Sequence, residues 1–517
     1  MSRERVAAVA FGMLPALAFP EPAWWWSAYV ALVPCLLVVI AAPSGREATL
    51  RGWLGGAGFF VAISHWLVPK VGPGLVPIAL LLGLSWIPWG WLAWRGNRAR
   101  GVSTAVVATS AAWVAGEFVR STEYLGGPWG LLGASQWNNL LILEFASLGG
   151  VWGVSFVVCA VNVALAFALF RRSTRADLLQ AFATGATLVM GSLAYSWLHD
   201  VPVGDSLRVA GVQPGVVHDT TERFEQELRA SQALPRGFDL VVWGESSVGA
   251  VGAQPRSMVR LVDTASALDA PLLINIDTRR GEGGIFKSSV LIGDEVLGSY
   301  DKIRLVPFGE YIPMRRLFGW LPRVSDAPPE DRRRGEELEI LKAGELAIGP
   351  VVCFESAFPD MSRSLAAKGA DVIVVQSATT TFQQSWAPEQ HAALAAVRAV
   401  ESGRAVINAT LSGVSAAFDA SGRRHLWFGT ERTGTYSFVI PLASATTPYA
   451  RWGDWLPIAA IGLTLLWSFA PLPKAAPYGP RRVSGTTRER GISRIIGPKE
   501  TLDFESTRDD QSSARNQ

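Results

Sequence analysis

Long apolar runs alternate with short charged stretches over the first 200 residues, and one more apolar run follows near residue 460. The runs at 75–94 and 149–170 contain no Asp, Glu, Lys or Arg. A helix that crosses the hydrocarbon core of a bilayer needs about 20 apolar residues. The pattern therefore predicts about eight membrane spans, near residues 6–22, 24–41, 52–69, 75–94, 102–119, 149–170, 178–198 and 455–471.

The pattern changes between residues 205 and 445, where charged residues become frequent and apolar runs shorten to the length of strands. Helical patterns at 219–233, 255–268 and 387–403 stand among these runs. Alternation of strands and helices is typical of an α/β domain. The strands are predicted at 207–214, 238–245, 270–277, 288–293, 346–354, 371–378 and 405–412.

Composition supports a membrane protein, and the pattern along the chain divides it into four regions. Hydrophobic residues make up 49% of the chain and charged residues only 18%, with a mean hydropathy of +0.24. We predict a transmembrane bundle at 1–198, an α/β domain at 205–445 and a last span at 455–471. The tail at 474–517 is polar and nearly free of aromatic residues, which predicts disorder.

The distribution of basic residues predicts the orientation. Arg3 and Arg5 precede the first run, and further Arg residues gather in alternate loops, at 46–51, 95–100 and 171–175. Basic loops stay in the cytoplasm, so both termini are expected there and the α/β domain outside the cell membrane. The alternative for the first run is a signal peptide, but no small-residue cleavage site follows it. A net charge of +3 gives no indication of nucleic-acid binding.

Cys353 is the one cysteine of the predicted outer domain, since Cys35 and Cys159 fall in apolar runs. It has no partner there for an internal disulfide, and oxidising compartments disfavour idle thiols. Such a thiol can simply be a small buried hydrophobic residue. Alternatively it is a nucleophile, which needs a base to take its proton and a cation nearby.

Candidates for both partners stand near the ends of predicted strands. Glu245 closes the strand in VVWGES, Lys302 and Glu310 lie in YDKIRLVPFGEYIP, and Glu355 follows the cysteine in VVCFES. We expect burial to raise the proton affinity of Glu245, which suits a base. Lys302 and the backbone N–H of Phe354 suit the oxyanion of an attacked carbonyl. Each residue alone also fits an ordinary surface or turn position.

The sequence does not match the motifs of other catalytic classes. Residues 244–249 (GESSVG) miss the Gly-x-Ser-x-Gly spacing by one residue, and the sequence has no HExxH, CxxC or Walker loop.

The series VWGES, YDKIRLVPFGEYIP and VCFES resembles the Glu–Lys–Cys core of the nitrilase superfamily. Together with the membrane bundle, it resembles the superfamily's membrane-embedded branch, the apolipoprotein N-acyltransferases. Residues 123–136 (EYLGGPWGLLGASQ) resemble the proline–tryptophan loop of that branch, and 398–416 its closing segment. The likeness extends from the first predicted span to the last.

The resemblance implies a four-layer α-β-β-α sandwich on an eight-helix bundle. It implies Glu245 as general base, Lys302 as stabiliser of the tetrahedral intermediate and Cys353 as nucleophile. Glu310 resembles a further essential acidic residue, while Phe354 and Glu355 follow the nucleophile, the first at a position that is often Tyr. The implied reaction moves an acyl chain from the sn-1 ester of a membrane phospholipid, through a Cys353 thioester, to the α-amino group of a diacylglyceryl-modified apolipoprotein. The resemblance implies neither a metal nor a dissociable cofactor.

Two segments depart from the family's pattern. VQSATTTF (375–382) has Ser377, Ala378 and Thr379 where the family has an Asn-containing stretch, and the segment after residue 214 lacks an expected Trp. The amide contact of that Asn is therefore in question.

Two other functions compete with acyl transfer. A membrane-tethered amidase would use the same three residues with water as acceptor, although one anchoring helix would serve it. A transporter would place ionisable residues within its spans, where His65 is one of few candidates and lies near a span end. No inverted hydropathy repeat is evident either.

Overall fold

The protein is described here from a computed structural model, which covers residues 1–99, 101–125, 127–171, 175–198, 204–249, 254–281, 284–320, 322 and 328–471. A helical bundle is formed by the chain before residue 199 together with the helix that begins at Trp455. An α/β domain lies between these two parts of the sequence. The predicted tail at 474–517 falls outside the described residues.

The bundle consists of α-helices joined by short 3-10 segments. Its α-helices are α1 (Arg3–Gly12), α2 (Val33–Ile40), α3 (Gly45–Ile63), α4 (Val68–Val71), α5 (Leu75–Gly83), α6 (Ile87–Gly96), α7 (Val102–Arg120), α8 (Leu140–Leu143), α9 (Ala146–Arg171), α10 (Arg175–Leu198) and α17 (Trp455–Phe469). The 3-10 segments are η1 (Leu14–Ala18), η2 (Trp25–Tyr29), η3 (His65–Leu67), η4 (Gly72–Gly74), η5 (Leu84–Trp86), η6 (Glu123–Leu125) and η7 (Leu132–Gln136).

Three helical stretches of the described residues are long and apolar enough to cross a membrane, namely His65–Gly96, Val102–Arg120 and Ala146–Phe170. Trp25–Ile40, Phe182–Tyr195 and Trp455–Phe469 are apolar but shorter. The structure thus supports an apolar helical bundle, while the number of eight spans stays a prediction.

Two of the predicted spans are interrupted and are not continuous α-helices. The apolar helical stretch Trp25–Ile40 lies at the predicted span 24–41, but within it η2 ends at Tyr29 and α2 starts at Val33 with Pro34 in its first turn. Proline has no N–H to donate and suits the start of a helix rather than its interior. The predicted span at 52–69 also breaks, since α3 ends at Ile63 and a second helical run begins at His65.

Glycines let α3 approach α5 and α6 closely. A Cβ atom on Gly52 would lie 3.0 Å from the Cα atom of Gly90, and one on Gly56 would lie 2.8 Å from the carbonyl oxygen of Gly83. Close backbone approach of this kind is how helices pack where no water drives them together.

The α/β domain contains two six-stranded sheets. The first has the order β12 (Gly434–Pro441), β1 (Ser206–Gln213), β2 (Leu240–Trp243), β3 (Leu272–Arg279), β4 (Ile285–Ile292) and β5 (Val296–Asp301). The second has the order β11 (Arg424–Phe428), β10 (Ser415–Phe418), β9 (Ala405–Thr410), β8 (Val372–Ser377), β7 (Leu346–Val352) and β6 (Leu341–Ala343).

Both sheets have the same internal plan. Three central strands run parallel, β1–β2–β3 in one sheet and β7–β8–β9 in the other, and antiparallel strands flank them. Parallel strands bring their carboxyl ends to one edge. The backbone N–H of Glu245, beyond β2, donates a hydrogen bond of 3.1 Å to the carbonyl of Ser377, at the end of β8. The carboxyl edges of the two sheets therefore meet.

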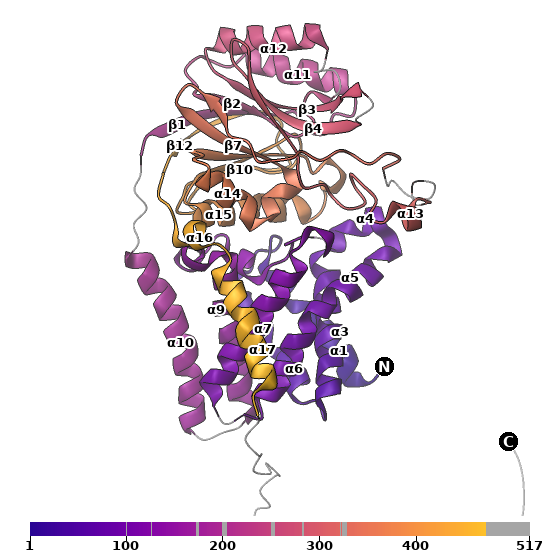
Figure 1. The fold of residues 1–517 in the computed structure, drawn as a ribbon, viewed down its shortest axis with the longest axis vertical. Coiled ribbons are helices and arrows are strands. Elements are labelled where there is room, and N and C mark those ends of the chain that lie inside the picture. The colour runs from indigo at the N-terminus through magenta and orange to yellow at the C-terminus, as the bar shows by residue number, and fades with distance from the viewer. Residues whose placement is uncertain are drawn as a thin grey trace, which may run out of the picture. The chain divides into compact units, whose positions relative to one another are not determined.

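Helices cover the outer faces of the sheet pair (Figure 1). α11 (Thr220–Gln232) and α12 (Pro255–Leu268) pack on the first sheet around Phe224, Trp243 and Leu261. α14 (Pro359–Ala367) and α15 (Ala387–Ser402) pack on the second sheet, and apolar side chains such as Val242 and Val374 fill the space between the sheets. The layers follow the α-β-β-α order expected from the sequence.

The predicted strands and helices of this domain all have counterparts in the structure, within a few residues. The prediction missed β5, β6, β10, β11 and β12, which stand at the margins of the sheets. These strands are short or half-exposed, as in the alternating burial of β12, so they lack the continuous apolar runs that marked the central strands. The remaining elements are α13 (Arg315–Phe318), η11 (Cys353–Ala357), η12 (Thr380–Phe382) and α16 (Pro448–Trp452).

Candidate active site

Glu245 lies where β2 ends, with only 5% of its surface exposed. A Cβ atom on the preceding Gly244 would lie 1.9 Å from the backbone nitrogen of Leu411, so no side chain fits there. This close approach of the two sheets holds the Glu245 backbone at their common edge.

Lys302 follows β5 and is buried against two carboxylates. Its Nζ atom lies 3.5 Å from Oε1 of Glu245 and 2.9 Å from Oε2 of Glu310. The Glu310 carboxylate also accepts a hydrogen bond of 2.9 Å from the backbone N–H of Val306. Glu310 thus fixes the lysine together with the loop that follows it, and both residues occupy the predicted site.

Cys353 stands at the turn between β7 and η11 with a φ of +51°, in the left-handed region. A residue with a side chain pays about 1–2 kcal/mol for this conformation, and such strain is common at active sites. The residue as a whole is half-buried. Burial raises the pKa of its thiol to about 12, with further raising by the charge of Glu245 and by the hydrogen bond to that carboxylate, while Lys302 opposes the rise.

The expected rise in the proton affinity of Glu245 was wrong. Burial alone would raise its pKa, but the nearby charges of Lys287 and Lys302 outweigh burial and lower the pKa to about 2. Glu245 is therefore an ionised carboxylate beside a neutral thiol. It can accept the thiol proton only as sulfur bonds to an electrophile, because the free thiol holds its proton more tightly.

Glu355 lies behind the nucleophile and joins two loops. Its Oε1 atom accepts hydrogen bonds from the Tyr300 hydroxyl at 2.7 Å and from the backbone N–H of Ile303 at 2.8 Å. Its Oε2 atom accepts the N–H of Val352 at 2.7 Å. Glu355 therefore ties the segment around Lys302 to the turn that carries Cys353.

Phe354 faces the loop at 127–132, which comes from the bundle. The Phe354 ring packs edge-on against Phe358 with centroids 5.0 Å apart, and a Cβ atom on Gly127 would lie 2.8 Å from its Cζ atom. In the same loop, the Trp129 indole stacks on His391 at 6.3 Å and donates a hydrogen bond of 2.9 Å to Gln390. The loop thus contacts the nucleophile's turn and α15.

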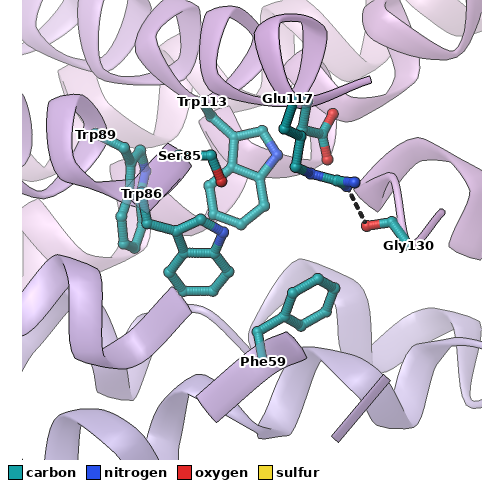
Figure 2. A pocket seen from close by; sticks show the side chains of 8 residues that line it. Phe59, Ser85, Trp86, Trp89, Trp113, Glu117 and Gly130 are labelled. Carbon is teal, nitrogen blue, oxygen red and sulfur yellow. Dashed lines mark hydrogen bonds between the residues drawn. The ribbon is translucent and has the colours of Figure 1, made fainter. Parts of the chain in front are cut away.

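Two residues of α7 form hydrogen bonds with the backbone of this loop. Glu117 accepts the backbone N–H of Leu132 at 2.7 Å, and Arg120 donates to the carbonyls of Trp129 and Gly130 at 2.7 and 3.0 Å. Figure 2 shows the Gly130 bond and the indoles that line the adjoining cavity, which has room for about one water molecule.

Two residues near Cys353 were missed by the sequence analysis. His391 of α15 is buried, and its Nε2 atom lies 3.1 Å from the Cys353 carbonyl, which fits an Nε2–H donor. Burial lowers the pKa of His391, so the ring is neutral. Lys287 of β4 lies 2.9 Å from Oε1 of Glu245. The sequence did contain a signal for Lys287, namely a lysine within the strand sequence IFKSSVLI.

At the position of the missing Asn, Ser377 is fully buried, and its hydroxyl donates a hydrogen bond of 3.1 Å to Oδ1 of Asn408. Asn408 belongs to the neighbouring strand β9 and donates from its amide to the Val414 carbonyl. An amide is therefore present beside this position, on a different strand.

Within the described parts of the chain, no group of three or more His, Cys, Asp or Glu side chains is arranged to hold a metal ion. The ammonium groups of Lys287 and Lys302 contact the carboxylates of Glu245, Glu310 and Asp277.

Family models match both architectural parts. The apolipoprotein N-acyltransferase N-terminal domain matches residues 11–164, and the carbon-nitrogen hydrolase domain matches residues 208–447.

Curated relatives align along nearly the whole chain. A protein of Azotobacter vinelandii is 32% identical over 497 residues, covering 89% of this chain and 93% of its own. Proteins of Pseudomonas aeruginosa and Geobacter metallireducens are 30% and 28% identical, covering 89% and 90% of this chain and 94% and 95% of their own. All three are named apolipoprotein N-acyltransferase. Among solved structures, an amidase from Nesterenkonia sp. matches with a TM-score of 0.35 and 22% identity, over 49% of this chain and 95% of its own.

Proposed function

The chain belongs to the apolipoprotein N-acyltransferase family, and on that premise we propose how its own residues carry out the reaction. It is an acyltransferase of lipoprotein maturation with a carbon-nitrogen hydrolase domain. The proposal concerns the roles of Cys353, Glu245 and Lys302, the two lipid substrates and the orientation in the membrane.

In the first half-reaction, Sγ of Cys353 attacks the sn-1 ester carbonyl of a phospholipid. As the C–S bond forms, the thiol proton passes to Glu245 and the carbonyl oxygen becomes an oxyanion beside the Lys302 ammonium. The C–O bond then breaks, and Glu245 returns the proton to the departing hydroxyl of the lysophospholipid. A thioester remains on Cys353.

In the second half-reaction, the α-amino nitrogen of a diacylglyceryl-modified N-terminal cysteine attacks the thioester. Glu245 takes a proton from this nitrogen, the C–S bond breaks and an amide forms. The sulfur regains its proton from Glu245, which restores the resting state.

The contact geometry supports these roles. Glu245 and Lys302 lie 3.5 Å apart, and both act electrostatically on the Cys353 thiol. Glu310 holds the lysine at 2.9 Å, so the ammonium stays in place as charge develops. This convergence on Cys353 is the observation that carries the proposal.

Aromatic side chains near the site support lipid substrates. Trp66, at the end of the bundle, packs against Trp129 and Phe382 with centroids 5.1 and 4.9 Å apart. Trp129 in turn stacks on His391, whose ring contacts the Cys353 carbonyl. A series of contacting rings thus connects the bundle to the nucleophile's turn. An acyl chain that leaves the bilayer for Cys353 would pass along these rings.

We place both termini in the cytoplasm and the α/β domain on the outer face of the cell membrane, with about eight spans. The alternation of Arg-rich and Arg-poor loops supports this orientation. An enzyme that joins two membrane-anchored substrates gains encounter rate by being anchored beside them.

The test is a two-stage assay of the purified full-length protein in detergent with a phospholipid labelled in its sn-1 chain. Lysophospholipid and protein-bound label should form in equal amounts, and a diacylglyceryl lipopeptide should then remove the label as an amide. Release of free fatty acid in place of both products would overturn the proposal in favour of hydrolysis.

A further inference from the structure

Lys287 is a charged residue of the site that the reaction scheme does not use. It lies within β4, and only 7% of its surface is exposed. Its Nζ atom donates hydrogen bonds to Oε1 of Glu245 at 2.9 Å and to the Ser246 hydroxyl at 3.0 Å.

One oxygen of Glu245 therefore faces two ammonium groups at different distances. Lys302 lies 3.5 Å from Oε1, whereas Lys287 lies at 2.9 Å and within hydrogen-bonding geometry. Lys302 makes its shorter contacts with Glu310. The lysine that directly holds the Glu245 carboxylate is thus Lys287.

Lys287 stands directly opposite Asp277 of β3, and this cross-strand pairing of opposite charges accounts for part of the charge at its position. The strand around Lys287 otherwise consists of apolar and small residues. A buried ammonium is costly unless carboxylates surround it. Asp277 and Glu310 lie 3.8 and 3.9 Å from Nζ, beyond the shorter contact with Glu245.

We propose that Lys287 is a positioning residue for the acyl-transfer reaction, which fixes the Glu245 carboxylate and leaves the Lys302 ammonium to serve the reacting carbonyl. The inference rests on the proposed function, because it assigns a division of labour between two lysines of the same site.

A consequence for the pH profile follows from the charges around Glu245. The groups that act on it are Lys287 and Lys302 as cations, Asp277 and Glu310 as anions, and the Cys353 thiol and the neutral His391 ring. A cation within about 4–6 Å lowers a carboxyl pKa by about 1–3 units. Removing the nearer cation should raise the pKa of Glu245 from about 2 to about 3–5, so the base begins to lose its charge in that pH range.

The experiment measures the rate of thioester formation in a single turnover, with brief pH jumps between pH 3 and 8, on the full-length protein in phospholipid micelles. For the wild-type enzyme we expect the titration of Glu245 to change the rate little in this range, since its carboxylate stays ionised. For Lys287→Met and Lys287→Gln we expect a lower rate and an acid limb moved upward by about 1–3 pH units. Lys287→Arg, which keeps the charge, should lose rate without gaining that limb.

Lys342→Met provides the matched control, because it makes the same change at an exposed lysine on β6. A wild-type acid limb in both Lys287→Met and Lys287→Gln would overturn the inference, and so would the same limb in Lys287→Arg. If neither uncharged variant folds, Lys287→Arg decides, since a new acid limb there contradicts the role and a lower rate with the wild-type limb supports it. Absence of any thioester in the wild-type enzyme would instead count against the proposed function.

Discussion

The Glu355 carboxylate accepts a hydrogen bond of 2.7 Å from the Tyr300 hydroxyl, which joins the turn after Cys353 to the last residues of β5. Lys302 lies two residues beyond Tyr300. The two halves of the candidate site, one on each sheet, are thus connected through a buried carboxylate that does not itself face the thiol.

This connection predicts the effect of Glu355→Gln. The amide would turn a donor toward backbone N–H groups that need an acceptor, and a buried group left unsatisfied costs about 1–3 kcal/mol. We expect kcat to fall about tenfold or more with little change in KM, because Lys302 and Cys353 lose their alignment. Tyr300→Phe removes only one donor and should have a smaller effect. A large rise in KM at unchanged kcat would place Glu355 in substrate binding instead.

A second prediction concerns Lys302→Met, which removes the ammonium beside the developing oxyanion. Loss of one oxyanion donor lowers rates by about 10²–10³-fold. Thioester formation, followed by quenching and measurement of protein-bound label, should fall by that factor. Lys342→Met is the control, and a rate for Lys302→Met within about twofold of that control would remove Lys302 from the oxyanion site.

Gly127→Ala tests the contact between the bundle loop and Phe354. Gly127 has a φ of +71°, and an added Cβ atom would lie 2.8 Å from the Phe354 ring. We expect a loss of stability of about 1–2 kcal/mol from the left-handed backbone, and a slower acyl transfer from displacement of Phe354. Gly74→Ala is the control, since a Cβ atom there meets only Val71 at 3.8 Å. Wild-type transfer in Gly127→Ala would show that the loop need not touch the nucleophile's turn.

Glu401 predicts a dependence of stability on pH. This α15 residue is buried, and its Oε1 atom accepts the N–H of Val151 in α9 at 2.6 Å. Burial raises its pKa from 4.5 to about 7, although Arg398 and the Val151 bond act in the opposite direction. Its contribution to stability is complete below pH 4.5 and is lost as the pH rises through 7, by at most about 3 kcal/mol.

Glu401→Gln should abolish this pH dependence while keeping an oxygen that can accept the Val151 N–H. The measurement is the melting temperature in detergent between pH 5 and 8. We expect the wild-type protein to lose stability across this range more steeply than the variant. Parallel curves would contradict the assignment.

The sequence sufficed for the central strands and for naming a candidate site, whose catalytic roles stay a prediction, because both leave strong local signals. Val372–Ser377 is a continuous apolar strand, and YDKIRLVPFGEYIP is a long and specific string. The predicted partners Glu245, Lys302, Glu310 and Cys353 come together in the structure because the carboxyl ends of both sheets meet.

The features that could not be predicted from the sequence depend on distances between segments that lie far apart along the chain. The low pKa of Glu245 arises from Lys287 and Lys302, and Lys287 stands on a strand that carried no predicted site residue, so a rule based on burial alone predicted the wrong direction. The role of Glu355 likewise depends on Tyr300 and Val352. In the bundle, the break between η2 and α2 escaped detection, because hydropathy does not register where a proline starts a new turn.

The most direct test of the account is intact and peptide mass spectrometry of the protein after exposure to phospholipid. We predict one acyl adduct on Cys353, released by neutral hydroxylamine as a thioester is, and no adduct in Cys353→Ala, which should still insert in the membrane. Lysophospholipid release by Cys353→Ala at the wild-type rate, or an acyl group carried by Cys35 or Cys159 instead, would contradict the central claim.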